Sequence, residues 1–378
     1  MPVTETPPQV RVLQSLAEVP AATWNSLAGE QAFLRHEFLY ALEETRCVGA
    51  ETGWYPQYLS AWRDEKLVGA LPLFLKTHSY GEFVFDWAWA EAYARHGLEY
   101  YPKLLVAAPF SPVSGARLLA EDAAVRALLI RSAIHAAQDF SSLHVLFPWA
   151  EEAAEWKEHG CMLRQGVQFH WKNDRYTCFD DFLKTLTQPK RKKISQERRR
   201  VRDTGLVMGW KTGGEIGQSD WVFFHRCYSL TYAAHRSTPY LNLEFFQKLG
   251  KTMAQHVCMV VASREGEPIA AALNFYDSQR LYGRYWGAVE YVPGLHFEVC
   301  YYQAMEFCIA NGIEWMEGGA QGEHKLARGF LPVQTWSAHW LRHPEFADAV
   351  DRFLAREAQG IAGYLDELNE RTPFKRKA

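Results

Sequence analysis

The sequence lacks the cysteine pairs of a disulfide or zinc framework. Its seven cysteines are scattered, and no two of them form a C-x-x-C pair. An odd number of scattered cysteines is typical of a protein kept in a reducing compartment. The chain also lacks the apolar core of an N-terminal signal peptide, and it has no run of about 18 apolar residues that could cross a membrane. We therefore expect a cytoplasmic protein with no membrane span.

An excess of charge of one sign is missing as well, together with several familiar catalytic motifs. The 378 residues carry a formal net charge of −3, which gives no general attraction to DNA or to an anionic membrane. The sequence contains no G-x-S-x-G motif, no P-loop and no dinucleotide-binding fingerprint. His339 and His343 are four residues apart, but Pro344 and a strand-like context argue against a helical metal pair. We expect no covalent nucleophile, no metal and no permanently bound cofactor.

Hydrophobic periodicity predicts strands and helices that alternate along the whole chain. In the first half the predicted strands include residues 10–16, 57–63, 67–76 and 82–89, and a helix is predicted over 121–138. In the second half a meander of strands is predicted over 257–286, followed by a helix at 296–311 and a strand at 313–316. This pattern indicates an α/β chain.

A charged hairpin occurs once in each half of the sequence. Residues 63–70 (RDEKLVGA) and 264–271 (REGEPIAA) both combine a strand end, a tight charged turn and a strand that opens with small residues. The order of predicted helices and strands around the two hairpins also matches. A long-period repeat of this kind implies two copies of one domain. We expect domains at 1–175 and 176–378, the second of which contains the active site.

Glycines and ionisable residues are concentrated between residues 317 and 330, directly after a predicted strand. Such groups at the end of a buried strand are a common way to build a substrate site. Lys325 could stabilise negative charge on a carbonyl oxygen, Glu317 could orient or deprotonate an amine, and His324 could carry protons. A surface salt bridge or a structural hydrogen bond is the alternative for each of them.

A second group of candidates lies between residues 190 and 202, where eight of thirteen residues are Lys or Arg. Ile194 and Val201 would share one face of a helix, and the other faces would attract phosphates of a tRNA, a nucleotide diphosphate or coenzyme A. A solvated helix face is the alternative. The candidate substrate-binding residues are Lys190, Arg191, Lys193, Arg198 and Arg199 on this helix, Gly318, Gly319 and Arg328 near the predicted strand end, and His296 at the start of the helix at 296–311.

Three features together resemble the FemAB-like branch of the tandem GNAT acyltransferases. They are the repeated hairpin, the basic segment that begins with Lys190-Arg191-Lys192-Lys193-Ile194, and the segments Glu317-Gly318-Gly319 and Lys325-Leu326-Ala327-Arg328-Gly329-Phe330. The resemblance implies two tandem GNAT-like domains, each a mixed, mostly antiparallel sheet flanked by helices. It also implies a role for Lys325 in donor binding or catalysis. A tyrosine acid is implied in the helix at 296–311, where Tyr301 and Tyr302 are adjacent; Tyr302 is the candidate, and core packing is the alternative for either tyrosine.

The resemblance further implies direct transfer of an aminoacyl group from aminoacyl-tRNA onto the amine of a small molecule or peptide, in chemistry related to peptidoglycan. The sequence has no good copy of the Arg/Gln-x-x-Gly-x-Gly/Ala turn with which many GNAT proteins hold coenzyme A, and this favours tRNA as the carrier. Transfer from acyl-CoA to a small amine remains an alternative. A third interpretation is a catalytically silent pair of domains that binds RNA or serves as an adaptor.

Overall fold

The computed structural model describes residues 6–320 and 322–375, and the chain divides into two compact units. Unit 1 consists of Met1–Gly166 and Gln334–Gly363, and unit 2 consists of Val167–Val333 and Tyr364–Ala378. The domain boundary expected at residue 175 did not anticipate that residues 334–363 return to the first unit. In the described ranges, no helix is both long and apolar enough to span a bilayer.

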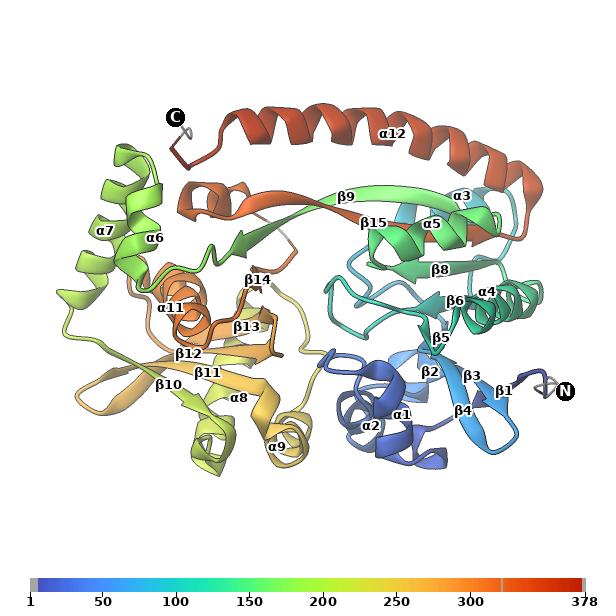
Figure 1. Cartoon of the computed structure of the whole chain (residues 1–378), viewed down its shortest axis with the longest axis horizontal. Helices are drawn as coiled ribbons and strands as arrows, with labels where there is room; N and C mark the ends of the chain where they lie inside the picture. The colour runs from blue at the N-terminus through green and yellow to red at the C-terminus, as the bar shows by residue number, and fades with distance from the viewer. Residues whose placement is uncertain (1–5, 321, 376–378) are drawn as a thin grey trace, which may run out of the picture. The chain divides into compact units, whose positions relative to one another are not determined.

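Unit 1 contains two groups of hydrogen-bonded strands (Figure 1). One has the order β1 (Gln9–Leu13), β3 (Tyr58–Arg63), β4 (Lys66–Leu71), β7 (Leu119–Ala120). The other has the order β15 (Leu331–Leu341), β8 (Ser142–Leu146), β6 (Lys103–Val106), β5 (Leu73–Lys76), β2 (Trp54–Pro56). Its longest described helix apart from α12 (Pro344–Glu370) is α4 (Ala123–Ala137), whose Val125, Leu129 and Ile130 pack with strand residues in one apolar core.

Unit 2 is a sheet with helices on both faces (Figure 1). The strand order is β10 (Val207–Thr212), β11 (Val257–Arg264), β12 (Glu267–Tyr276), β13 (Arg280–Ala288), β14 (Trp315–Glu317), β9 (Met162–Lys172). On one face, Tyr285 of β13 contacts α8 (Gln218–Ala234) and α9 (Leu243–Thr252) through Tyr228 and Phe246. The core of the other face includes residues of α6 (Phe179–Thr185), α7 (Gln188–Arg202), α10 (Leu295–Phe297), the π-helix η5 (Glu298–Tyr302) and α11 (Gln303–Ala310).

The repeated hairpins have the same detailed geometry in the two units. Asp64 and Glu265 both adopt a left-handed conformation at the turn, with φ of 54° and 52°. The register also shifts at equivalent places, between Ala61 and Trp62 in one hairpin and between Ala262 and Ser263 in the other. A shared bulge at the same distance from the same turn is expected when one domain has been duplicated.

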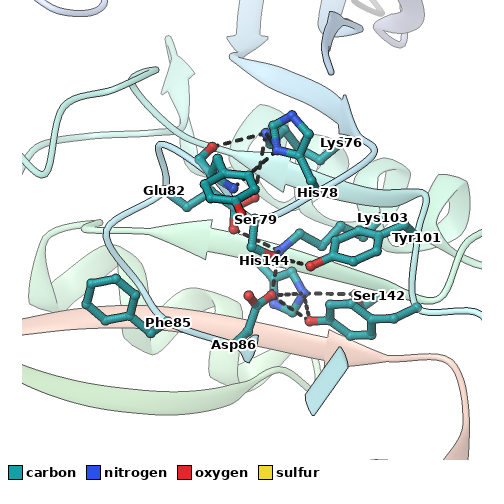
Figure 2. A network of polar contacts seen from close by, with 12 residues as sticks. Lys76, His78, Ser79, Glu82, Phe85, Asp86, Tyr101, Lys103, Ser142 and His144 are labelled. Carbon is teal, nitrogen blue, oxygen red and sulfur yellow. Dashed lines mark hydrogen bonds and ion pairs between the residues drawn. The ribbon is translucent and has the colours of Figure 1, made fainter. Parts of the chain in front are cut away.

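The prediction of a strand at residues 82–89 is wrong. These residues form a loop after β5 and the first turn of α3 (Trp87–Arg95). The loop carries two acidic side chains, Glu82 and Asp86, onto the paired strand ends of Lys76 and Lys103 (Figure 2). The ion pairs of Glu82 and Asp86 with the two lysines therefore decide the conformation of this segment, although its apolar residues predicted a strand.

Lys103 is the centre of this buried network. Its side chain has no exposed surface, and its ammonium donates to Ser79 Oγ at 2.8 Å, to Glu82 Oε2 at 2.7 Å and to Asp86 Oδ2. Burial raises the pKa of the Glu82 carboxyl, while the Lys103 ammonium holds the pKa of Asp86 well below its usual range against the opposing effect of burial. Because buried charge is costly to desolvate, each member depends on its partners.

The network continues across the sheet through histidines and hydroxyl groups. Tyr100 donates to Asp86 Oδ2 at 2.7 Å and lies 2.9 Å from His144 Nε2, while His144 Nδ1 lies 2.7 Å from His339 Nδ1. Burial lowers the pKa of both imidazoles, so they stay neutral at pH 7 and one ring donates a hydrogen to the other. These polar contacts therefore hold together the loop that follows β5, the strands β5, β6, β8 and β15, and the start of helix α3 in unit 1.

We predict that Lys103→Met lowers the free energy of unfolding by about 3–5 kcal/mol, because it leaves two buried carboxylates without their shared cation. The matched control is Lys66→Met, which removes an exposed lysine that pairs with Glu121. The control should cost less than about 1 kcal/mol, as is usual for a surface ion pair. Urea denaturation of the two variants measures both values, and equal losses would show that the network does not stabilise the loop.

A close approach of strand to helix fixes the position of β13. A Cβ atom on Gly287 would lie 2.0 Å from the carbonyl oxygen of Cys227 in α8, and Thr231 of the same helix donates to Trp286 O at 2.8 Å. Only glycine lets the strand and the helix backbone come this close.

We predict that Gly287→Ala destabilises the protein by about 1–3 kcal/mol through overpacking. Gly209→Ala on the exposed strand β10 is the control, because a Cβ there meets nothing within 4 Å. Thermal unfolding should separate the two variants, and a Gly287→Ala protein as stable as the control would contradict the close contact.

Candidate active site

Two neighbouring parallel strands of unit 2 stay paired over only a short length. In the described residues, β13 and β14 are in register at Arg280 with Trp315, Leu281 with Met316 and Tyr282 with Glu317. Beyond these pairs lies a pocket of about 80 Å³ lined by Ala272, Leu273, Asn274, Gly283, Arg284, Tyr285, Trp286, His296, Cys300, Tyr301 and Gly318. The separated strands leave backbone groups and side chains of β13 facing this pocket.

A bulge in β13 shapes one wall of the pocket. Asn274 of β12 pairs with Gly283 and Leu273 pairs with Tyr285, so Arg284 is the extra residue of a β-bulge. Bulges of this kind re-aim side chains and are common beside active sites. The bulge places the Arg284 side chain in the lining of the pocket, and Arg284 is close enough to Lys325 to lower the pKa of that lysine.

The opposite wall comes from α10 and the π-helix η5. The ring of His296 lies 4.6 Å from that of Trp286 and 5.3 Å from that of Tyr301. Burial lowers the pKa of His296 to about 4, with His324 and Arg328 adding to the effect, so this imidazole is neutral at pH 7. A π-turn is rare and often marks a functional site, and here it brings Cys300 and Tyr301 to the pocket.

Lys325 lies in the short helix η6 (Glu323–Arg328) and is only 2% exposed. Its ammonium donates to the carbonyl oxygen of Gly319 at 2.9 Å, and a Cβ on Gly318 would lie 3.2 Å from its Cε atom. Gly319 has a φ of +85°, which favours glycine. Burial lowers the pKa of Lys325 to about 8, so the side chain is a cation at pH 7 that can lose its proton in mildly basic solution.

His324 is connected to the pocket through Tyr301. The Tyr301 hydroxyl lies 3.1 Å from His324 Nε2, and Tyr301 lines the pocket while His324 is exposed to solvent. Partial burial and the nearby cations Lys325, Arg328 and Lys193 lower the pKa of His324. The imidazole is therefore neutral at pH 7 and can accept a proton.

Tyr302, the tyrosine expected as an acid, faces another direction. It is buried and donates its hydroxyl hydrogen to Glu197 Oε2 of α7, and burial raises its pKa. Arg328 donates to the other oxygen of Glu197 at 2.7 Å and lies 3.4 Å above the Phe297 ring. Tyr301, the neighbouring residue, is the tyrosine that reaches the pocket.

The basic helix predicted at 190–202 corresponds to α7, whose buried side chains are Ile194 and Val201. Lys190 and Arg191 are half-buried, whereas an outer face of the helix is formed by exposed cations, namely Lys192, Lys193, Arg199, Arg200 and Arg202. Arg198 differs from the expectation, because its guanidinium is paired with Glu298 at 2.9 Å and with Glu306 at 2.7 Å.

Glu317 ends β14 and is buried, with its Oε1 atom 3.5 Å from Arg280 Nη1. The structure thus gathers Lys325, His324, Gly318, Gly319 and His296 at one strand end, with Glu317 on the strand itself.

Sequence reasoning missed Asn274, Arg284 and Trp286, which line the pocket. Only Gly283, a glycine inside a strand, gave a signal of the bulge. The described residues contain no group of His, Cys, Asp and Glu that could hold a metal ion.

Several solved structures share this fold. FemX aligns with a TM-score of 0.55 at 10% identity, over 88% of this chain and 98% of that chain. The C-terminal domain of a putative lysylphosphatidylglycerol synthetase from Agrobacterium fabrum aligns with a TM-score of 0.53 at 10% identity, over 89% and 96% of the two chains. L-PGS from Bacillus licheniformis aligns with a TM-score of 0.52 at 13% identity, over 83% and 95%. At this identity, these similarities concern the fold alone.

No curated protein matches the sequence. A profile of the FemAB-like family, described as peptidoglycan biosynthesis and recognition, matches residues 15–376. The expected α/β fold, with mixed and mostly antiparallel sheets in two units, is confirmed. Because the match covers nearly the whole sequence, the chain belongs to the FemAB-like family.

Proposed function

We propose that the protein transfers an activated aminoacyl group from aminoacyl-tRNA onto an amine, and that the reaction takes place in the pocket beside β13 and β14. The observation that carries this proposal is the buried Lys325 ammonium at the point where the two strands separate. A cation in a site with little water stabilises the negative charge that develops on a carbonyl oxygen during acyl transfer. The FemAB-like family supports an acyltransferase, and its description supports an amine related to peptidoglycan as the acceptor.

In the reaction, the acceptor nitrogen forms a bond to the acyl carbon, and the ester bond to the carrier breaks. The amine loses one proton, and the oxygen of the leaving carrier gains one. Lys325 would polarise the carbonyl. Tyr301 and His324 would pass the amine proton outward, because Tyr301 lines the pocket and His324 is neutral and exposed. Glu317 would help to orient the ammonium form of the acceptor, which first loses one proton to solvent to become the attacking amine.

The outer face of α7 is a suitable surface for the carrier. Its exposed cations, Lys192, Lys193, Arg199, Arg200 and Arg202, can contact phosphate groups. Aminoacyl-tRNA and acyl-CoA both carry an activated acyl group on a phosphate-bearing carrier, so either could use this face. Lys193 is also near enough to His324 to lower its pKa, so this part of α7 lies near η6.

We predict that Lys325→Met lowers kcat by about 10²–10³-fold, the usual loss when one group that stabilises an oxyanion is removed. In the parent protein, kcat/KM should fall as the pH rises through about 8, because the Lys325 cation is then lost. The variant should lack this decline. Labelled aminoacyl-tRNA and acetyl-CoA, offered in parallel with peptidoglycan precursors as acceptors, give the rates.

Lys211→Met is the control for this experiment, because Lys211 is a partly exposed lysine of unit 2 that pairs with Asp220. It should keep the parent rate. Transfer from the thioester alone would establish the acyl-CoA alternative. If the parent transfers neither label, the protein is not an acyltransferase on these donors, and retained binding of tRNA would then support the adaptor interpretation.

A second prediction concerns the outer face of α7. Replacing Arg199 and Arg200 with Gln should raise the KM for the donor about ten-fold and reduce the slope of log affinity against log salt by about two. The control removes two exposed cations elsewhere in unit 2 by Arg226→Gln in α8 and Lys251→Gln in α9. Equal effects in the two double variants would mean that α7 is only a solvated face.

A further inference from the structure

Two consecutive residues of α7, Glu197 and Arg198, hold the two ends of the π-helix η5. Arg198 pairs with Glu298, the first residue of η5, and Glu197 accepts a hydrogen bond from Tyr302, the last one. Glu197 is the one acidic residue between positions 190 and 202, where eight others are Lys or Arg. A general attraction to phosphate does not account for an acid at this position.

The carboxylate of Glu197 uses both of its oxygens. Oε2 accepts from Tyr302, and Oε1 accepts from the guanidinium of Arg328 at 2.7 Å. Arg328 also donates to the carbonyl oxygen of His324 at 2.6 Å and is 2% exposed. Because His324, Lys325 and Arg328 belong to the same short helix, Glu197 fixes η6 against α7 through a charge-assisted bond.

Arg198 makes the matching contact on the other side. Its guanidinium binds both oxygens of Glu298, at 2.9 Å and 3.2 Å, and lies 2.7 Å from Glu306 of α11. The π-helix between these anchors carries Cys300 and Tyr301 to the pocket. A small displacement of α7 would therefore move both the pocket wall and the helix that contains Lys325.

We propose that Glu197 and Arg198 couple the cationic outer face of α7 to the acyl-transfer pocket, and that Glu197 is a positioning residue that acts through Arg328 on Lys325. The inference rests on the proposed function. The exposed cations Arg199 and Arg200 directly follow the pair in the sequence, so a phosphate-bearing carrier would bind one turn or less from the anchors. Binding of the donor would then order the same helices that polarise its carbonyl.

The test compares Glu197→Gln with the outer-face variant that replaces Arg199 and Arg200. We expect Glu197→Gln to lower kcat about 10- to 100-fold with an unchanged KM for the donor, since a small misplacement of a catalytic group costs this much. Glu197→Asp, which keeps the charge on a shorter side chain, should recover part of the rate. Glu244→Gln, on the exposed side of α9, is the matched control and should keep the parent rate.

A double-mutant cycle tests whether the two residues act as one unit. Glu197→Gln combined with Arg328→Gln should lose no more activity than the more severe single variant, because removing either partner already breaks the bond. Additive losses would overturn the coupling. The coupling would also be overturned if Glu197→Gln raised only the KM for the donor. It would be overturned as well if a smaller amount of folded protein accounted for the whole loss of activity.

A second measurement does not require turnover. Hydrogen exchange of the amides of η5 and η6 is followed with and without unfractionated tRNA, and then with coenzyme A. We expect tRNA to slow exchange in the parent protein and to have no such effect in Glu197→Gln at a concentration that saturates α7. Protection without turnover in the parent would refute the acyl transfer and keep the coupling. Turnover in the parent with equal protection in both proteins would refute the coupling and keep the acyl transfer.

Discussion

The site depends on a strand pair that is bonded at one end and open at the other. β13 and β14 are parallel neighbours for three residue pairs and then separate, and the pocket lies where pairing stops. The bulge at Arg284, the π-turn at Glu298–Tyr302 and the glycines after Glu317 all lie beside this opening. Each of them departs from regular structure, and together they let side chains and backbone groups converge on a small volume.

Buried charge has different uses in the two units. In unit 1, Lys103 and its carboxylate partners hold a loop over strand ends, with histidines and hydroxyl groups extending the network. In unit 2, the pairs Glu197–Arg328 and Arg198–Glu298 connect a cationic helix to the pocket, and Lys325 remains a buried cation bonded to a backbone carbonyl. Desolvation makes all these groups sensitive to the loss of a partner. Charge therefore fixes geometry in unit 1, and in unit 2 the same kind of contact is the basis of the proposed coupling between carrier binding and acyl transfer.

The sequence was sufficient for the duplication and the fold class, because the two hairpins repeat a charged turn whose left-handed residue and bulge follow from local chemistry. It also pointed to Lys325 and His324, since they follow a strand directly. It failed where long-range ion pairs decide the conformation. Glu82 and Asp86 looked like part of a strand, and Arg198 looked like a phosphate ligand. Tyr301 and Tyr302 could not be told apart, because a π-turn changes which of two adjacent side chains faces the pocket.

The most direct test of the account is a crystal structure of the protein with a stable amide analogue of a 3′-aminoacyl adenosine. We predict that the carbonyl oxygen of the analogue lies within hydrogen-bond distance of Lys325 Nζ, at about 3 Å, next to Tyr301 and the separated part of β13. An analogue bound with its carbonyl away from Lys325, while the Lys325 ammonium keeps its bond to Gly319, would contradict the account.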